Sequence, residues 1–253
     1  MDLSAFSLAG RTIAVTGANT GIGQGIAFSI ARAGGKVVGI GRSAMDETAA
    51  GVAGLGGAFA EVRADLGSGD NAPAVFEEIA GAYGAIDGLV NNAGIIRRRD
   101  AVDFTVEDWD DVMNVNLKST FFLAQAFARH VLSAGRRGKI VNIASLLSFQ
   151  GGIRVASYTA SKSGVLGLTR LLACEWAAKG VNVNAIAPGY IETNNTQALR
   201  DDPVRRAAIL DRIPAGRWGL PGDIGDAAVF LLAPASDYMH GSVIAVDGGW
   251  LAR

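Results

Sequence analysis

The sequence predicts an α/β fold in which helices cover both faces of a doubly wound parallel sheet. Seven short runs of apolar and β-branched residues recur along the chain, and segments with helical apolar spacing separate most of them. Near-continuous apolar strands that alternate with helices are typical of such sheets. The 253 residues contain no linker, low-complexity tract or internal repeat, so we expect a single domain over residues 1–253.

The predicted elements follow one another in a regular order. Each expected strand is a short apolar run bounded by turn-forming residues, and the seven runs cover residues 12–17, 36–41, 57–65, 86–94, 138–145, 181–189 and 241–249. Apolar residues spaced three or four positions apart predict helices over residues 21–33, 70–83, 107–134, 157–179 and 221–233.

Composition narrows the possible function classes. Apolar residues make up 49% of the chain and charged residues 19%, which favours a large core and argues against disorder. The net charge of −1 lacks the basic excess of proteins that bind nucleic acid or an anionic membrane surface. Because no run of 18 apolar residues occurs, we expect no membrane span.

Cysteine and histidine usage is compatible with a reducing compartment and argues against a metal site. The chain has one cysteine, Cys174, and two histidines, His130 and His240, so neither a disulfide framework nor a zinc site is expected. The first ten residues, MDLSAFSLAG, lack the basic and apolar regions of a signal peptide. We therefore expect a cytoplasmic protein without a metal site.

A glycine-rich turn follows the first expected strand. Gly17, Gly21 and Gly23 are spaced GxxxGxG and lead into the first helix. Glycine lets the backbone approach a pyrophosphate closely, and the N–H groups at a helix N-terminus favour an anion. A plain βα turn is the alternative, but the position after the first strand, with a second strand following, predicts dinucleotide binding.

The end of the second expected strand bears on the choice between NAD and NADP. An acidic residue there would bind the ribose 2′-OH, whereas an arginine can accept a 2′-phosphate. The strand ends at Gly41 and Arg42 with no carboxylate, which favours NADP or dual use. Alternatively, Arg42 stacks on the adenine or points to solvent. Asp65 is placed to contact the adenine amino group, and the NNAG turn over residues 91–94 the adenosine ribose.

Residues 188–220 are more polar and less regular than the rest of the chain. They follow the sixth expected strand, and α/β sheets bind ligands beyond the carboxyl ends of their strands. Long irregular connections in compact domains are often functional. We interpret this segment as a substrate lid, with an ordinary surface excursion as the alternative.

Tyr158 and Lys162 lie four positions apart on an expected helix, among small residues. Side chains at this spacing are neighbours, with Cβ atoms about 5–6 Å apart. An ammonium beside a phenol, aided by an oxidised nicotinamide, would lower the pKa of Tyr158 from its usual value of about 10 toward neutrality. The phenol could then exchange a proton with a substrate hydroxyl at working pH. Surface packing of the pair is the alternative.

Two further polar residues complete a proposed site for hydride transfer. Ser145 ends the fifth expected strand and could hydrogen-bond the same substrate oxygen as Tyr158, as an oxyanion donor does. Asn116 lies in the third expected helix, where it could hold a water that links Lys162 to solvent, or could merely bend its helix. Because Ser145 is not in a GxSxG elbow, a serine hydrolase is disfavoured.

Taken together, these residues resemble the short-chain dehydrogenase/reductase family over essentially the whole chain. The matching motifs are TGANTGIG at 16–23, NNAG at 91–94, YTASK at 158–162 and PG at 188–189, with Asn116 and Ser145. The resemblance implies a seven-stranded Rossmann-type sheet, NAD or NADP as cofactor, a homotetramer, and catalytic roles for Asn116, Ser145, Tyr158 and Lys162. The implied cofactor contacts are Gly17, Asn19, Thr20, Gly21, Ile22, Gly23, Arg42, Asp65, Leu66, Asn92, Ala93, Gly94, Tyr158, Lys162, Pro188, Gly189, Ile191 and Thr193.

Longer stretches, such as NNAGIIRRRDAVDF and IASLLSFQGGIRVASYTASKSGV, are similar to members of the family that act on six-carbon keto sugar acids. This resemblance implies interconversion of a secondary alcohol and a ketone on a sugar acid. An arginine could bind the substrate carboxylate with two parallel hydrogen bonds. We expect Arg154, with Gln150 and Asn194 or Asn195, to hold that substrate; for Arg154 the alternative is a structural ion pair.

Other activities would use the same catalytic residues with a different lid. They are oxidation of gluconate at carbon 5 and reduction of a 3-oxoacyl thioester. A thioester reductase usually needs a basic patch for its acidic carrier protein, and Arg97, Arg98 and Arg99 are a weak candidate for one. A non-catalytic dinucleotide-binding sensor is an alternative from another class, although the complete set of catalytic residues argues against it.

Overall fold

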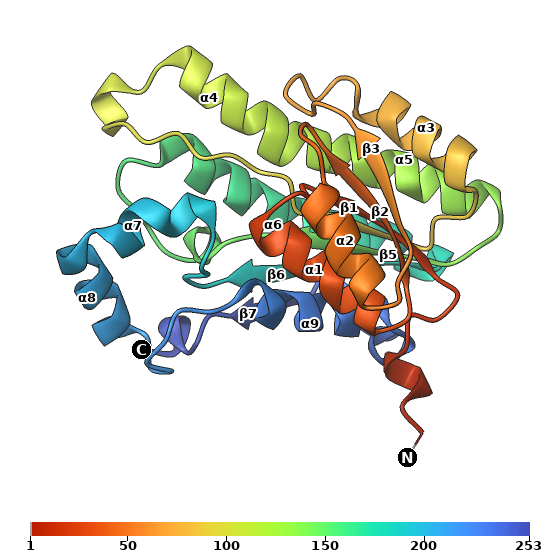
Figure 1. Ribbon diagram of the computed structural model, residues 1–253. Coiled ribbons are helices and arrows are strands. Elements are labelled where there is room, and N and C mark those ends of the chain that lie inside the picture. Colours follow the sequence, from red (N-terminus) through yellow and green to blue (C-terminus); the bar gives the residue numbers. More distant parts are fainter. Residues whose placement is uncertain (1) are drawn as a thin grey trace.

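The computed structural model describes residues 2–253 and contains a seven-stranded sheet in which every neighbouring pair is parallel (Figure 1). The strand order is β3-β2-β1-β4-β5-β6-β7, which confirms the predicted doubly wound fold. The strands are β1 Thr12–Thr16, β2 Lys36–Gly41, β3 Phe59–Arg63, β4 Gly88–Asn91, β5 Gly138–Ile143, β6 Val181–Pro188 and β7 Val243–Val246.

Helices connect the strands. They are α1 Gly21–Arg32, α2 Asp46–Gly54, α3 Ala72–Tyr83, α4 Val106–Met113, α5 Ser119–Ser133, α6 Ala156–Trp176, α7 Gln197–Asp201, α8 Pro203–Arg212 and α9 Pro221–Leu232. Single 3-10 turns cover Ser4–Phe6, Ala101–Asp103, Leu146–Ser148, Ala177–Lys179, Asn194–Thr196, Pro234–Ser236 and Trp250–Ala252. Helix α2 was not predicted, because its Ala- and Gly-rich sequence has little apolar periodicity.

The two faces of the sheet bury separate cores. Ile13 and Val15 of β1 face a core that includes α1 and α9, whereas Ala14 faces a core that includes α3, α5 and α6. This alternation follows from the two-residue period of a strand. Helices α1 and α9 approach closely because Gly25 leaves room, since a Cβ there would lie 2.5 Å from the Pro221 Cβ.

Reversal of the strand order between β1 and β4 opens a crevice at the carboxyl ends of these strands. Strand β1 pairs with β2 on one side and with β4 on the other, and the chain crosses from β3 to β4 to make that change. Such a switch point is where open α/β sheets bind ligands. The glycine turn after β1 and the NNAG turn after β4 both open into this crevice.

Two predicted segments differ in detail from the structure. The helix expected over 107–134 is divided into α4 and α5 by a π-helical turn, Asn114–Lys118, which contains Asn116. The segment 188–220, expected to be irregular, contains α7 and α8, which lie at the left of the molecule in Figure 1. Asp202 caps α8 by accepting hydrogen bonds from the backbone N–H groups of Val204 and Arg205.

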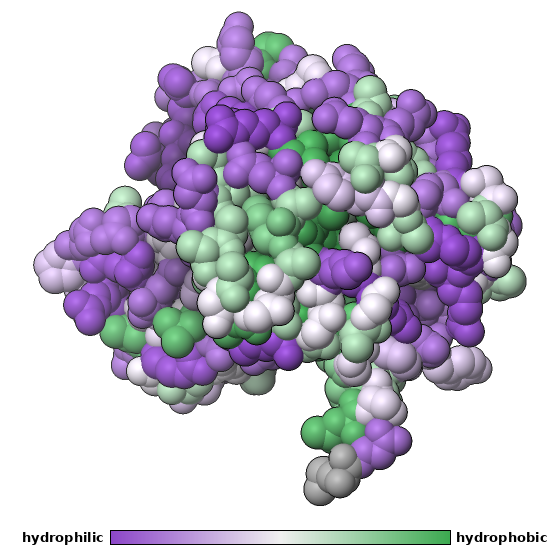
Figure 2. Space-filling model, turned by 45° about the vertical axis from the view of Figure 1, so that its right-hand side comes forward, coloured by the Kyte–Doolittle hydropathy of each residue, from purple (hydrophilic) through white to green (hydrophobic). Residues whose placement is uncertain are grey.

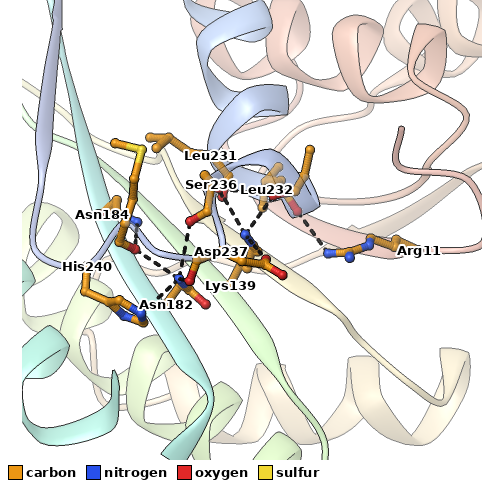
Figure 3. Close-up of polar contacts among 11 residues, drawn as sticks. Arg11, Lys139, Asn182, Asn184, Leu231, Leu232, Ser236, Asp237 and His240 are labelled. Atoms are coloured by element: carbon orange, nitrogen blue, oxygen red, sulfur yellow. Dashed lines mark hydrogen bonds and ion pairs between the residues drawn. The ribbon is translucent and has the colours of Figure 1, made fainter. Parts of the chain in front are cut away.

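A buried lysine ties the amino end of the sheet to the segment after α9 (Figure 3). The Lys139 Nζ, in β5, donates to the Ala233 carbonyl at 2.7 Å and to the Ser236 Oγ at 3.0 Å, and it pairs with Asp237 at 2.8 Å. Burial lowers the pKa of Lys139, and the Asp237 carboxylate opposes this effect. Since its partners compensate the charge, we interpret the cluster as structural.

Most of the face in Figure 2 is hydrophilic, and the N-terminal segment projects below it with apolar residues. Leu3 is 61% exposed and Phe6 is 50% exposed. The Phe6 ring stacks on Phe230 of α9, with ring centroids 6.3 Å apart. None of the helices in residues 2–253 combines the length and the apolar character needed to cross a membrane.

Candidate active site

A cavity of about 710 Å³ lies at the carboxyl ends of the strands. Most of the expected cofactor residues line it, together with two of the four expected substrate residues. The predicted residues along its wall are Gly17, Asn19, Thr20, Gly21, Ile22, Arg42, Asp65, Leu66, Asn92, Ala93, Gly94, Tyr158, Lys162, Thr193, Asn194 and Asn195. The cavity is therefore long enough to join the glycine turn, the Tyr158 phenol and the start of the predicted lid.

The glycine turn requires glycine at each of the three predicted positions. Gly17 and Gly21 have φ angles of +67° and +55°, which side chains rarely permit. At Gly23, a Cβ would lie 2.1 Å from the Gly17 carbonyl oxygen. This compact turn leaves the N-terminus of α1 open toward the cavity, which is the geometry that binds a pyrophosphate.

The NNAG turn is fixed to the glycine turn by hydrogen bonds. The backbone N–H groups of Asn92 and Ala93 both donate to the Thr16 Oγ1 at 2.9 Å. The Asn92 Nδ2 donates to the Thr16 carbonyl at 2.9 Å and to the Gly17 carbonyl at 3.3 Å. Asn92 therefore has a structural role within the turn, and its fixed position keeps Ala93 and Gly94 on the cavity wall.

Arg42 lies at the opposite end of the cavity from Tyr158, beside polar residues of the first two turns. The Asn19 Nδ2 donates to the Ser43 Oγ at 2.9 Å, and both residues line the cavity with Arg42. Within residues 2–253, Arg42 makes no ion pair. Asp65 accepts a hydrogen bond from the Gly67 N–H at 2.8 Å, which orients its carboxylate. The guanidinium is thus available for an anion.

Tyr158 and Ser145 are brought together by α6 and β5, as the sequence predicts. The Ser145 hydroxyl lies close enough to the Tyr158 phenol to influence its pKa. Burial raises the pKa of the Tyr158 phenol, while the Ser145 hydroxyl and the positive charge of Arg98 act in the opposite direction. In the protein alone, the phenol is therefore held in its protonated form, which is the form that donates a proton to a substrate oxygen.

Lys162 lies next to this pair but does not act on it as the sequence analysis expects. Its Nζ lies 5.7 Å from the centre of the Tyr158 ring and donates to the Ile143 carbonyl at 2.6 Å. Burial lowers the pKa of Lys162 to about 8. The expectation that Lys162 lowers the pKa of Tyr158 is wrong for the protein alone, because desolvation raises that pKa and the groups that oppose the rise are Ser145 and Arg98.

Asn116 is buried at the π-helical turn, where its side chain is held by the segment after the NNAG turn. Its Oδ1 accepts from the Ile95 N–H at 2.8 Å, and its Nδ2 donates to the Ile95 carbonyl at 3.0 Å and to the Ser161 Oγ at 3.2 Å. Both Asn116 and the Lys162 Nζ lie near Gly94. Asn116 therefore orders the wall beside Lys162.

The expected substrate residues have different surroundings. Asn194 and Asn195 line the cavity, whereas Gln150 and Arg154 do not. Arg154 is largely exposed and pairs with Asp100 at 3.2 Å, which is the structural ion pair considered as its alternative. Gln150 accepts a hydrogen bond from the Trp250 Nε1–H at 3.1 Å. The structure thus gives no support to a substrate role for Gln150 or Arg154.

Sequence reasoning missed Arg98 as an individual site residue. Its charge acts on the Tyr158 phenol, and its guanidinium donates to the Asn195 carbonyl at 3.2 Å. By contrast, Arg97 pairs with Asp108 and Asp111, and Arg99 pairs with Asp108. No pattern in RRR separates the three arginines, because the difference depends on the path of the backbone after the NNAG turn.

Several apolar or small residues on the cavity wall were also not predicted. Position could have identified some of them, because Ser43 directly follows Arg42, Ile95 follows the NNAG turn, and Ile143 precedes Ser145 by two residues. The full set of additional lining residues is Ile40, Gly41, Ser43, Ala64, Ile95, Val115 and Ile143. They contribute shape rather than charge. Among the predicted cofactor residues, Gly23, Pro188, Gly189 and Ile191 do not line the cavity.

The fold and this site define an NAD(P)-dependent alcohol dehydrogenase or ketoreductase. A family model described as enoyl-(acyl carrier protein) reductase matches residues 17–251. The 2-dehydro-3-deoxy-D-gluconate 5-dehydrogenase of Escherichia coli K12 is 60% identical over 253 residues, covering 100% of both chains. The chain belongs to the short-chain dehydrogenase/reductase family.

Two further proteins place the chain within that family. A crystal structure from Agrobacterium tumefaciens, provisionally described as a 2-deoxy-D-gluconate 3-dehydrogenase with bound NADP, is 60% identical, covers 98% of this chain and 99% of its own, and has a TM-score of 0.94. The gluconate 5-dehydrogenase of Gluconobacter oxydans is more distant, at 41% identity over 96% of each chain. Similarity to the first of these two is therefore greater.

Replacing Lys162 by Met should change how the stability of the cofactor-free protein depends on pH. The pKa of Lys162 is about 8 in the folded protein, below its usual value of 10.5. Between these values the unfolded chain binds more protons than the folded one, so wild-type stability should gain up to about 1.4 kcal/mol per pH unit relative to Lys162→Met. Denaturant unfolding at pH 8 and pH 10 measures this difference.

The contributions of other titrating groups to the free energy of unfolding cancel when the two proteins are compared at each pH. Equal pH dependence in wild type and Lys162→Met would contradict the desolvated ammonium.

Proposed function

We propose that the chain catalyses the reversible, NADP-dependent oxidation of 2-dehydro-3-deoxy-D-gluconate to its 5-keto form. The observation that carries the proposal is the half-buried Tyr158 phenol on the cavity wall, whose pKa both the Ser145 hydroxyl and the charge of Arg98 influence. A proton donor on the cavity wall thus has a hydroxyl and a cation near it. Full-length identity of 60% with an enzyme of that name supports the same substrate.

The residues of the chain fit a nicotinamide cofactor, because the compact turn at Gly17 and Gly21 lines the cavity and leads into the N-terminus of α1, where a pyrophosphate can bind. When bound, the nicotinamide supplies or accepts the hydride. Tyr158 donates a proton to the substrate oxygen during ketone reduction and takes it back during alcohol oxidation. Ser145 donates a hydrogen bond to the same oxygen and stabilises the charge that develops on it.

Lys162 and Asn116 take part in proton transfer and not in hydride transfer. With a pKa of about 8, Lys162 can exist in both protonation states near neutral pH. It is therefore suited to pass a proton toward Tyr158, with its Nζ held at the Ile143 carbonyl. Asn116 and the Lys162 Nζ both lie near Gly94. We propose that Asn116 holds a water through which Lys162 exchanges its proton with solvent. Lys162 also lines the cavity, where it can bind the nicotinamide ribose.

Arg98 is better placed than Arg154 to bind the carboxylate of a sugar-acid substrate. Arg98 is exposed, has no carboxylate partner within residues 2–253, and bonds to the lid at the Asn195 carbonyl. A guanidinium binds a carboxylate with two hydrogen bonds. We therefore propose that Arg98, with Asn194 and Asn195, holds the carboxylate of the substrate.

The surroundings of Arg42 support a preference for NADP. Arg42, Ser43 and Asn19 form a polar group at the end of β2, where no carboxylate is present to bind a ribose 2′-OH or to repel a phosphate. An arginine beside hydroxyl and amide groups is typical of a site for a 2′-phosphate. The preference for NADP over NAD would depend on the 2′-phosphate alone, because the hydride chemistry is the same for both nucleotides.

The competing activities receive less support. Since Arg97 and Arg99 are paired with carboxylates, residues 97–99 are not the free basic patch that an acidic carrier protein needs. Gluconate 5-dehydrogenase chemistry would use the same catalytic residues, but the relative of that name is 41% identical. A non-catalytic sensor would not need Tyr158 on the cavity wall with the Ser145 hydroxyl close enough to influence its pKa.

We also propose a cytoplasmic homotetramer. Exposed apolar residues on α4 and α6 support an interface along these helices. Val106 is 72% exposed, Trp109 is 40% exposed and Leu171 is 50% exposed. Covering such residues in an assembly would remove apolar area from water.

Purified protein should oxidise NADPH rapidly with 2,5-diketo-3-deoxy-D-gluconate as oxidant, because the site holds both a proton donor and a cation for the carboxylate. Tyr158→Phe should lower kcat about 10²- to 10⁴-fold through loss of the proton donor. Steady-state absorbance of NADPH measures turnover, and fluorescence titration checks that the variant still binds the nucleotide. Nucleotide binding without turnover of this substrate would redirect the assignment to gluconate and thioesters, and full activity of Tyr158→Phe would favour a sensor.

Arg98→Met should raise KM for the sugar acid about 10- to 100-fold, since it removes a charged hydrogen bond of about 1.5–3 kcal/mol. Arg154→Met is the matched control and should leave KM within about twofold, because Arg154 pairs with Asp100 at the surface. Initial rates over a range of substrate concentrations give both constants. A larger rise in KM for Arg154→Met than for Arg98→Met would mean that Arg154 binds the substrate carboxylate.

Arg42→Ala should lower kcat/KM for NADPH about 10- to 100-fold and leave that for NADH nearly unchanged, because only NADPH carries the 2′-phosphate. Assays with each nucleotide at saturating substrate measure the two values. A loss of equal size with both nucleotides would mean that Arg42 contacts the adenine rather than the phosphate.

A further inference from the structure

A small hydrophobic cluster, separate from the two sheet cores, joins the predicted lid to segments distant in sequence. Its members come from the turn after Ser145, from the lid and from the 3-10 turn Trp250–Ala252. The buried residues of this lid cluster are Leu146, Ile209, Ile213, Trp218 and Trp250. In Figure 1 this end of the chain lies beside α8. The lid thus has a core of its own.

Trp250 lies at the centre of the lid cluster and is 4% exposed. Arg212, the last residue of α8, lies over its ring at 4.1 Å from the centre. The Tyr190 ring, just after β6, is tilted against it with centroids 4.7 Å apart. Its indole N–H donates to the Gln150 Oε1 at 3.1 Å. One side chain therefore contacts the lid, the β6 turn and the loop that carries Ser145.

The turn before Trp250 is shaped to bring the indole back under the lid. Gly248 and Gly249 have φ angles of +64° and +88°. A Cβ at Gly248 would lie 2.9 Å from the Ile213 side chain, so only glycine lets the turn pass this close. The Gly248 carbonyl accepts from the Ala215 N–H at 3.0 Å. The Asp247 carboxylate accepts from backbone N–H groups of the turn and fixes its path.

The other end of the lid is fixed by backbone hydrogen bonds. Ile191 and Gly219 form a β-bridge at its base. The Gly219 N–H donates to the Tyr190 carbonyl and the Glu192 N–H donates to the Gly219 carbonyl, each at 2.9 Å. A segment that is pinned at its base and held elsewhere by a small cluster around one side chain can open when that cluster is weakened.

We propose that Trp250 is a positioning residue that latches α8 against the loop after Ser145, and that it sets substrate affinity through Asn194 and Asn195 at the start of the lid without touching substrate. The proposal rests on the substrate site of the proposed function. Apparent affinity falls in proportion to the fraction of molecules with the lid closed, because only that state holds the sugar acid. Substrate binding can still close a loosened lid, so KM should change more than kcat.

Trp250→Ala should expose α8 to trypsin at Arg205 and Arg206, which lie on its surface. We expect cleavage within the lid to accelerate about tenfold or more, because protease attack follows the population of the open state. KM for the sugar acid should rise about tenfold, with a smaller change in kcat and with NADPH affinity within about twofold. Cleavage sites are read by mass spectrometry and the constants by steady-state assay.

Milder variants keep the test valid if Trp250→Ala does not fold. Trp250→Phe keeps an aromatic ring but loses the indole N–H and part of the packing, while Gln150→Leu removes only the acceptor of that N–H. Each should loosen the lid partly, and the double variant should resemble Trp250→Phe, because both substitutions remove the same hydrogen bond. Tyr238→Ala, at a fully exposed aromatic residue, is the control and should leave cleavage and KM unchanged.

Trypsin cleavage needs no substrate, so this arm tests the latch even if the substrate assignment fails. Unchanged lid cleavage in folded Trp250 variants would overturn the latch. A uniform loss of thermal stability with cleavage throughout the chain would also overturn it, since Trp250 would then support the whole fold. Absence of turnover in the wild-type protein would count against the proposed function alone.

Discussion

The hydrogen bond from the Lys162 Nζ to the Ile143 carbonyl fixes α6 against the end of β5, and the catalytic geometry depends on it. Tyr158 lies one helical turn before Lys162, and Ser145 lies two residues after Ile143, so this contact brings phenol and hydroxyl together. The small residues of α6 make the approach possible. A Cβ at Gly164 would already lie 3.0 Å from the Leu117 side chain.

The same close packing sets the protonation of the site. Burial raises the pKa of Tyr158 and lowers that of Lys162, so both groups are driven toward their neutral forms. Spacing in the sequence gives the distance between two charges but not the water removed from them. For that reason the sequence identified the pair correctly and predicted the direction of the Tyr158 shift wrongly. Reduction of a ketone requires a protonated phenol beside the ketone oxygen. In the protein alone, burial of Tyr158 keeps the phenol in that form.

The parts that the sequence predicted are those governed by local rules. Strand positions follow from apolar runs, and the turn at Gly17 and Gly21 follows from the backbone freedom of glycine. The missed parts depend on distant contacts. The turn at Asn116 is π-helical where its side chain bonds to Ile95, and α2 has an Ala-rich sequence without a clear apolar stripe. Arg98 differs from its neighbours only in the partners that the fold supplies.

We place substrate specificity in the lid, which has a small core separate from the two cores of the sheet. The glycine turn and Tyr158 rest on the two sheet cores, whereas the lid rests on its own cluster around Trp250. Contacts within a separate small core can change without disturbing the strands, because the two share few side chains. One scaffold can then keep the proton donor and the nucleotide site while its lid adapts to different substrates. Gln150, expected to touch substrate, instead joins the Ser145 loop to that lid.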